Sequence, residues 1–390
     1  MRPLEDREGA GALRPSWAEI DLDALVANLA LVRTRVGGAR VLGIVKADAY
    51  GHGAPQVART LAAAGIDFLG VAMVEEGAEV RRAGVEAPIL MLGPLRREQL
   101  PLVPRYRLTP AVSSLDQLES WLEWCAATGH QQDIHLKVDT GMRRLGIELE
   151  AVPRALALVR AQPCLRLTGV LSHLADADDL DSLRNEDQEE RFEGVLAQLT
   201  PAEREAVWIH LANSAAALHW PPTRHTLVRC GLALYGLDPA RVEHELVPAL
   251  SIRARVVTVR DVPTGGRVGY SGRWTALRPS RIGVLQLGYA DGYPWRLGNR
   301  AEALVDGRRV PVVGAVSMDM ITVDLTDTAA GLGSEVILLG RQGAVEISAW
   351  EIAERADTIP YEVLTRFGLR LARHYRQGGE IVETTARHLA

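Results

Sequence analysis

Two lysines stand apart in a chain that otherwise uses arginine for positive charge. Lys46 lies in V-K-A-D-A-Y-G-H-G (45–53) and Lys137 in H-L-K-V-D-T-G (135–141), and they are the only lysines among 44 Lys and Arg residues in a chain of 390. Genome composition or a trend toward thermostability would account for the arginine excess. A lysine amine, unlike a guanidinium, can lose its proton near neutral pH and act as a nucleophile. The two retained lysines therefore indicate amine chemistry.

The elements that would position these lysines form a repeating pattern through about residue 235. Short, mostly apolar runs, typical of strands buried on both faces of a parallel sheet, alternate with amphipathic stretches such as 114–127, for which Ser114 is the expected N-cap. Eight such alternations predict an α/β fold with an N-terminal (β/α)8 TIM-type barrel over residues 1–244, and an open doubly wound sheet is the competing fold. The runs are 40–46, 68–73, 88–93, 108–112, 133–139, 167–174, 207–213 and 225–231.

The pattern changes after Leu237-Asp238-Pro239, where strands follow one another directly. Asp306-Gly307 is a hairpin signal between two of them, and one late helix is expected at 350–356. We therefore expect a mainly β C-terminal domain over residues 245–390. Its predicted strands are 250–259, 281–287, 302–313, 320–325 and 335–339.

The candidate functional residues fall at the carboxyl ends of the predicted barrel strands, where the loops of a barrel surround one mouth. They are Lys46, Lys137, His173, Asn213, Ser214 and Arg229. Taken singly, each has an ordinary structural explanation, such as a helix N-cap for Ser214 or an ion pair for Arg229. Together, a nucleophilic lysine, a helix start able to bind phosphate and Gly231 on the last strand fit pyridoxal phosphate held as a Schiff base.

Bulk composition excludes several other classes of protein. A net charge of −5 and a pI near 6.1 argue against nucleic-acid and membrane-surface binding. The three cysteines are scattered and predict neither a disulfide framework nor a metal site. No secretory signal or run of about 20 apolar residues is visible, so a cytoplasmic location is expected.

Nine motifs, in order along nearly the whole chain, resemble those of the alanine racemase family, whose members combine a barrel with a β domain and use pyridoxal phosphate. Besides 45–53, they are H-L-K-V-D-T-G-M-R-R-L-G (135–146), S-H-L-A-D (172–176), H-L-A-N-S-A-A (210–216), R-C-G-L-A-L-Y-G (229–236), V-G-Y-S (268–271), G-Y-A-D-G-Y (288–293), S-M-D-M (317–320) and P-Y-E-V (360–363).

The resemblance implies that Lys46 binds the cofactor and is the base on one face of the substrate Cα. Tyr270 of a partner subunit would be the base on the other face, so the active form would be a homodimer. Because a tyrosine ordinarily has a pKa near 10, its phenolate must be favoured, and His173 with Arg229 behind it would do this. Arg229 would also donate to the ring nitrogen of the cofactor and limit transamination.

The resemblance implies roles for the remaining residues as well. Lys137 would be carbamylated by CO2 and would position Arg144, which binds the substrate carboxylate; a plain ion pair of Lys137 with Asp139 is the alternative. Cofactor binding would involve Tyr50, Asn213, Ser214, Gly231, Leu232 and Tyr361. The substrate carboxylate would meet the backbone N–H of Met318 of the partner subunit, and Tyr289 would line the entry to the pocket. The implied activity is interconversion of L- and D-alanine, which supplies D-alanine for peptidoglycan precursors.

Departures from the family pattern, among them Asp48 and Arg143, leave the substrate range open. A serine racemase is one alternative, since a small pocket separates methyl from hydroxymethyl poorly. A cofactor-carrying barrel that is not an enzyme would lack residues 245–390. A decarboxylase of the same fold would carry an acidic residue in the place of Arg229.

Overall fold

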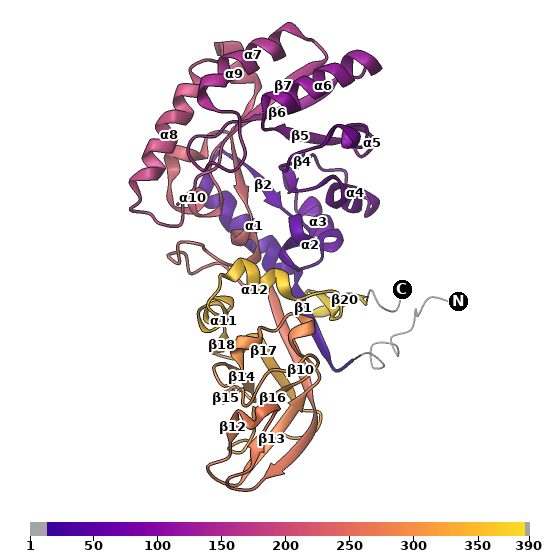
Figure 1. Ribbon diagram of the computed structural model, residues 1–390, viewed down its shortest axis with the longest axis vertical. Helices are drawn as coiled ribbons and strands as arrows, with labels where there is room; N and C mark the ends of the chain where they lie inside the picture. Colours follow the sequence, from indigo (N-terminus) through magenta and orange to yellow (C-terminus); the bar gives the residue numbers. More distant parts are fainter. Residues whose placement is uncertain (1–13, 387–390) are drawn as a thin grey trace, which may run out of the picture. The chain divides into compact units, whose positions relative to one another are not determined.

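The computed structural model of the protein describes residues 14–386. This part of the chain divides into two compact units (Figure 1). The barrel unit comprises residues 24–49 and 54–247, and the β unit comprises residues 14–23, 50–53 and 248–386. The division differs from the expected boundary at 244/245 chiefly at the N-terminus, because β1 (Ser16–Asp21) pairs with strands of the β unit.

The barrel unit contains an eight-stranded parallel sheet with the order β8-β7-β6-β5-β4-β3-β2-β9. Backbone bonds from Thr226 N to Ile209 O (3.2 Å) and from Arg229 N to Ala212 O (3.0 Å) connect its two ends. The barrel expected from the sequence is therefore confirmed, and each strand falls within or beside one of the predicted apolar runs. The strands are β2 (Arg40–Ile44), β3 (Phe68–Val71), β4 (Ile89–Met91), β5 (Leu108–Val112), β6 (Gln132–Lys137), β7 (Leu165–Leu171), β8 (Trp208–His210) and β9 (Leu227–Cys230).

Helices follow the strands of the barrel, and α6 (Leu115–Thr128) shows how the sequence sets their ends. Ser114 Oγ accepts from Gln117 N, as predicted, and Gly129 ends the helix with a φ of 70°. Leu118, Trp121 and Cys125 form its buried face. The other helices are α1 (Leu22–Val36), α2 (Lys46–Tyr50), α3 (Ala54–Ala63), α4 (Val74–Arg82), α5 (Leu102–Arg105), α7 (Val152–Ala161), α8 (Leu183–Leu196), α9 (Pro201–Ala206) and α10 (Ser214–His219).

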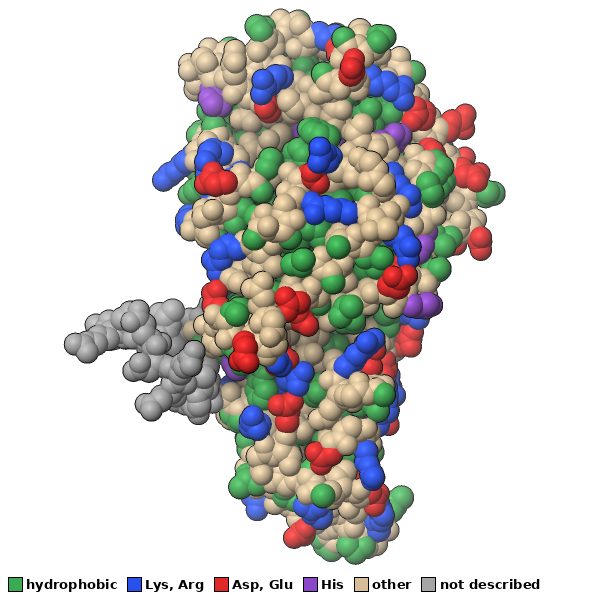
Figure 2. Space-filling view, turned by 180° about the vertical axis from the view of Figure 1, so that it is seen from behind, with side chains coloured by type: hydrophobic (Ala, Val, Ile, Leu, Met, Phe, Trp, Pro, Cys, Tyr) green, Lys and Arg blue, Asp and Glu red, His purple; other side chains and the backbone are tan. Residues whose placement is uncertain are grey.

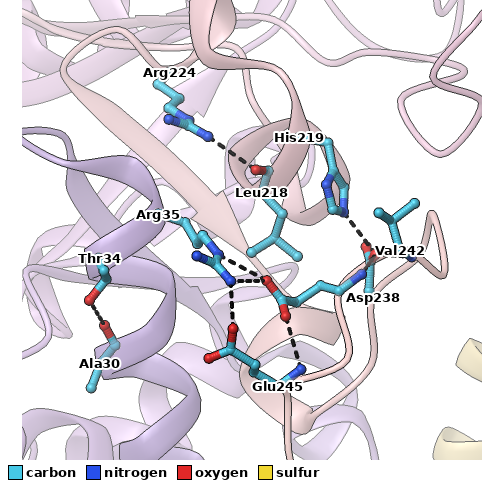
Figure 3. A network of polar contacts seen from close by, with 10 residues as sticks. Ala30, Thr34, Arg35, Leu218, His219, Arg224, Asp238, Val242 and Glu245 are labelled. Atoms are coloured by element: carbon cyan, nitrogen blue, oxygen red, sulfur yellow. Dashed lines mark hydrogen bonds and ion pairs between the residues drawn. The ribbon is translucent and has the colours of Figure 1, made fainter.

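A polar network fixes the segment that leaves the barrel unit (Figure 3). Asp238 accepts from His219 Nε2 at 2.8 Å and from the backbone N–H of Val242 at 2.7 Å. Arg35 of α1 forms ion pairs with Glu243 at 2.8 Å and with Glu245 at 3.0 Å. These contacts hold the segment on the barrel unit as far as Glu245.

The β unit is built on a ten-stranded sheet whose main path is β15-β14-β17-β10-β1-β19-β20. Asp306 and Gly307, with φ of 49° and 73°, form the predicted tight turn between β14 and β15. Its strands are β1, β10 (Leu250–Val262), β13 (Ser280–Leu285), β14 (Glu302–Val305), β15 (Arg308–Pro311), β16 (Ile321–Asp324), β17 (Glu335–Gln342), β18 (Val345–Ile347), β19 (Ala372–Gln377) and β20 (Glu380–Thr385). A ribbon of β11 (Arg267–Val268) and β12 (Trp274–Thr275) and the helices α11 (Ala349–Ala356) and α12 (Pro360–Arg366) complete it.

Charged side chains of both signs are interspersed over the face seen in Figure 2. Many of the arginines are ion-paired; Arg309, for example, contacts Glu302 at 2.9 Å and Glu351 at 2.7 Å. Among residues 14–386, none of the helices is both long and apolar enough to span a bilayer.

Candidate active site

Lys46 follows β2 directly and begins an unusual turn. The next four residues, Ala47, Asp48, Ala49 and Tyr50, all have φ of 52–53°, and Ala49 N donates to Val45 O at 3.0 Å. This is a left-handed helical turn made without glycine, a conformation that costs about 1–2 kcal/mol per residue. Side-chain contacts must therefore hold the turn in place.

Two carboxylates form hydrogen bonds at this turn, Glu76 from outside it and Asp48 from within it, and Glu76 is not among the residues singled out from the sequence. Glu76 Oε1 accepts from Ala47 N at 2.7 Å, and Asp48 Oδ1 accepts from Ala54 N, at the start of α3, at 2.8 Å. The only sequence signal for Glu76 is its place in the first turn of a helix that follows an apolar run, which is typical of an N-terminal capping residue.

The loop after β6 folds back beside Lys137 and carries Arg144. Ile147 N donates to Lys137 O at 2.8 Å, and Asp139 N donates to Ile147 O at 3.0 Å. Gly146, with a φ of 147°, makes this possible, because a Cβ there would lie 2.4 Å from Asp139 N. The loop thus returns to Lys137, and Arg144 within it lies close enough to lower the pKa of that lysine.

Burial lowers the pKa of Lys137 to about 8, and the nearby cations Arg229 and Arg144 contribute to this lowering, against the attraction of Asp139. Asp139 Oδ1 is already occupied by the backbone N–H groups of Gly141 at 2.9 Å and Arg143 at 3.1 Å. Within the described residues, Lys137 and Asp139 form no direct ion pair. A neutral amine at Lys137 is therefore accessible near physiological pH.

The pKa of Lys46 is lowered too, first by burial and then by Arg144, while Glu76 raises it. Lys46 in turn is among the cations that lower the pKa of Lys137. The two lysines and Arg144 thus form one cluster of positive groups at the carboxyl ends of the strands.

Arg229 of β9 is buried, and its partners are neutral groups. It donates from Nη1 to His210 O at 2.7 Å and from Nη2 to Ser172 O at 2.7 Å and Leu211 O at 2.9 Å. Burial lowers its pKa to about 10. A buried guanidinium without a carboxylate partner among the described residues favours an anionic or strongly accepting ligand.

Arg229 also fixes the tautomers of neighbouring histidines, because a guanidinium can only donate. Its Nη2 lies 3.1 Å from His173 Nδ1 and its Nη1 lies 3.2 Å from His210 Nδ1. Both imidazoles therefore carry their proton on Nε2. Burial, and then Arg229 in the case of His173, holds the pKa of both rings well below the ordinary value.

His135 extends this network into the barrel interior. Its Nδ1 lies 2.9 Å from His210 Nε2 and accepts the hydrogen bond from that atom. Gly169 of β7 provides the space, because a Cβ at that position would lie 2.4 Å from His135 Nδ1. His135 is not recognisable as part of the site from the sequence, because its partner lies 75 residues further along the chain.

Ser214 has a different role from the N-cap that the sequence suggested. Asn213 is the N-cap of α10 and accepts from Ala216 N at 3.2 Å, so Ser214 is the first helical residue. The Ser214 hydroxyl instead accepts from Gly231 N at 2.8 Å, which joins the start of α10 to the end of β9. Leu232 follows directly, in the short helix Leu232–Tyr235.

The β unit holds the other predicted residues. The rings of Tyr50 and Tyr361 lie 6.1 Å apart, and burial raises the pKa of Tyr50. Tyr289 N donates to Ser317 O at 3.0 Å, which places Tyr289 beside the segment that carries Met318. Tyr270 lies after β11 with 75 % of its surface exposed.

The cluster in the barrel unit fits pyridoxal phosphate. The ligand is an anion with a phosphate, and it would meet the amine of Lys46, whose pKa is lowered by burial and by Arg144, in a cluster where burial and the cations Arg229, Arg144 and Lys46 lower the pKa of Lys137. The negative charge of the bound cofactor would reduce the repulsion among these positive groups. The lowered pKa of Lys46 leaves more of its amine neutral, which is the nucleophilic form that links to the cofactor.

Comparison with known proteins agrees with this site. The model of the alanine racemase N-terminal domain matches residues 20–239 and that of the C-terminal domain residues 249–375. The alanine racemase of Symbiobacterium thermophilum is 40% identical over 372 residues, 94% of this chain and 98% of that protein. That of Sorangium cellulosum is 41% identical over 388 residues, 94% of this chain and 100% of that protein.

Two solved structures are similar over nearly their whole length. The alanine racemase from Bacillus anthracis with bound L-Ala-P has a TM-score of 0.90 and 32% identity, covering 97% of this chain and 99% of that one. The alanine racemase from Bartonella henselae with covalently bound pyridoxal phosphate has a TM-score of 0.85 and 30% identity, covering 93% and 100%.

The barrel, its lysine site and these matches define a pyridoxal-phosphate-dependent isomerase. Within that class, the chain belongs to the alanine racemase family.

Proposed function

We propose that this protein interconverts L- and D-alanine with pyridoxal phosphate, using one base on each face of the substrate Cα. The observation that carries the proposal is the site at the barrel mouth, where Lys46, with a lowered pKa, lies among Lys137, Arg144 and Arg229. The choice of alanine as the substrate rests on the relatives, since the Bacillus anthracis alanine racemase structure contains bound L-Ala-P.

Residues of this chain would hold each part of the cofactor. Lys46 would link to its aldehyde carbon, and Asn213 would be a further cofactor-binding residue. The phosphate end would be held by Tyr50, Ser214, Gly231, Leu232 and Tyr361. Arg229 would donate to the ring nitrogen, since a guanidinium has donors and no acceptor. When bound, pyridoxal phosphate makes the α-hydrogen of a linked amino acid acidic.

Lys46 would then serve as the base on one face of Cα, because its amine is free once the substrate has taken its place on the cofactor. Burial and Arg144 hold the pKa of this amine below its ordinary value, which favours the neutral form that a base needs.

Tyr270 of a partner subunit would be the base on the opposite face, so that the working form is a homodimer. Its 75 % exposure leaves its hydroxyl available to a second chain. His173 supports this role, because Arg229 fills its Nδ1 and leaves Nε2–H as a donor toward a phenolate. Such a donor favours the ionised tyrosine.

Lys137 would be modified by CO2. The neutral amine adds to the carbon of CO2 and loses a proton, which turns a positive side chain into a carbamate anion. With a pKa of about 8, Lys137 presents enough neutral amine for this reaction at neutral pH, and an anion there would pair with Arg144. Arg144, so positioned, would bind the substrate carboxylate together with Met318 of the partner subunit, and Tyr289 would line the entrance.

The proposal is tested by incubating the protein with pyridoxal phosphate and L-alanine in D2O and following deuterium at Cα together with the D/L ratio. D-alanine carrying deuterium is the expected product. Binding of the cofactor without either signal would refute alanine as the substrate and bring L-serine, the next candidate, into the same assay. Release of CO2 from the amino acid would identify a decarboxylase. D-alanine production in cells would separately test the supply of peptidoglycan precursors.

A further inference from the structure

Glu76 is one of two glutamates in the first turn of α4, and its carboxylate has two separate sets of contacts. Oε2 accepts from Ala72 N at 2.7 Å and Met73 N at 3.2 Å, which satisfies the N-terminus of α4. Oε1 points the other way and accepts from Ala47 N at 2.7 Å, the residue after Lys46. The side chain thus bridges the end of β3 and the turn that follows β2.

The contact with Ala47 falls where the backbone needs support. Ala47 begins the run of left-handed residues, and alanine adopts this conformation only under constraint. The second carboxylate contact, from Asp48 to Ala54 N, lies on the far side of the turn. Glu76 therefore holds the end of the turn to which Lys46 is attached.

The same carboxylate acts on the amine of Lys46. The other charged or titratable groups acting on Lys46 or responding to it are Arg144, Lys137 and His173. Among these, Glu76 is the only acid, and it raises the pKa that burial and Arg144 lower.

From these contacts we propose that Glu76 is a positioning residue, which holds the left-handed turn so that Lys46 points into the site and places one negative charge beside its amine. The inference rests on the proposed role of Lys46 as the residue that links the cofactor. A helix cap alone would need only the Oε2 contacts, so the bond to Ala47 N is the feature that a capping role leaves unexplained.

The first test uses the full-length protein, freed of cofactor, and its Glu76→Gln variant. Acetic anhydride at trace level, with mass spectrometry of the Lys46 peptide, reports how the reactivity of this amine depends on pH. We expect the midpoint to move to lower pH in Glu76→Gln, because the charge that favours the ammonium is gone. Glu75→Gln is the matched control: it removes an exposed carboxylate from the same helical turn and should leave the midpoint in place. If the labelling midpoint of Lys46 stays in place or moves to higher pH in Glu76→Gln, the proposal that the charge of Glu76 acts on the Lys46 amine is refuted.

The second test measures positioning through the affinity for pyridoxal phosphate, followed by the absorbance of the cofactor. Glu76→Gln should bind it about 10- to 100-fold more weakly than Glu75→Gln, the range expected for one lost hydrogen bond to a charged group. Adding Ala47→Gly should reduce this penalty, because glycine adopts the left-handed conformation without strain. A penalty that is absent, or that is the same with and without Ala47→Gly, overturns the positioning role and leaves a simple helix cap.

If Glu76→Gln folds poorly, the double variant Glu76→Gln/Ala47→Gly still decides the question. Recovery of folding in the double variant supports the proposal that Glu76 holds a strained turn, and failure to recover contradicts it. Borohydride reduction and peptide mapping separate this inference from the proposed function. Attachment of the cofactor at a residue other than Lys46 would refute the proposed function, whereas the labelling midpoint would still decide whether Glu76 acts on Lys46.

Discussion

Lys137 should make the stability of the cofactor-free protein depend on pH in a defined window. Its side chain is buried, and its pKa in the folded protein is about 8 against 10.5 for an ordinary lysine. Because the folded pKa is the lower one, the unfolded chain binds more protons between these values, and the free energy of unfolding rises with pH there. Between about pH 6.5 and about pH 9.5, these two pKa values raise the free energy of unfolding by about 2 kcal/mol through Lys137 alone.

The assay is chemical denaturation of wild type and Lys137→Met in buffers freed of CO2, at both pH values. Methionine keeps the unbranched apolar stem and does not titrate, so subtracting the variant removes the contribution of the other groups. The difference between the two proteins should change by about 2 kcal/mol in favour of wild type as the pH rises. Added bicarbonate should stabilise wild type further and leave the variant unchanged, because only the lysine can form a carbamate. A difference that stays constant across this pH range would refute the reasoning about the buried amine.

Three substitutions test local contacts within the barrel unit. Gly169→Ala should lower the free energy of unfolding by about 1–3 kcal/mol, because its Cβ would enter the ring of His135. Gly194→Ala is the control, since it lies in a helix with open space around it, and it should be neutral or stabilising by up to about 1 kcal/mol. Ser114→Ala should cost about 1 kcal/mol by removing the bond from Gln117 N. Thermal unfolding measures all three, and a Gly169→Ala variant as stable as Gly194→Ala would show that His135 can move aside.

The barrel strands could be predicted because each is a continuous apolar run, which follows from burial on both faces. The helix after Ser114 and the turn at Asp306-Gly307 could be predicted as well, because local side-chain chemistry determines both. The clustering of Lys46 and Lys137 followed from the rule that strand ends in a barrel surround one mouth.

Other features depend on partners that the local sequence does not reveal. β1 alternates buried and half-buried residues like an ordinary strand, but its partners are β10 and β19, which lie far along the chain. The left-handed turn is made of A-D-A-Y, with no glycine to signal it, and it becomes understandable only with Glu76 in place. The pairing of His135 with His210 likewise needs the closed barrel, although both residues lie within recognised motifs.

The measurement that tests the central claim most directly is deuterium exchange at Cα of each alanine enantiomer, in D2O, by the Tyr270→Phe variant loaded with pyridoxal phosphate. The account predicts that exchange from L-alanine is abolished, while cofactor binding and exchange from D-alanine through Lys46 persist. Wild-type rates of exchange from both enantiomers would contradict the assignment of Tyr270 and Lys46 to opposite faces of the substrate.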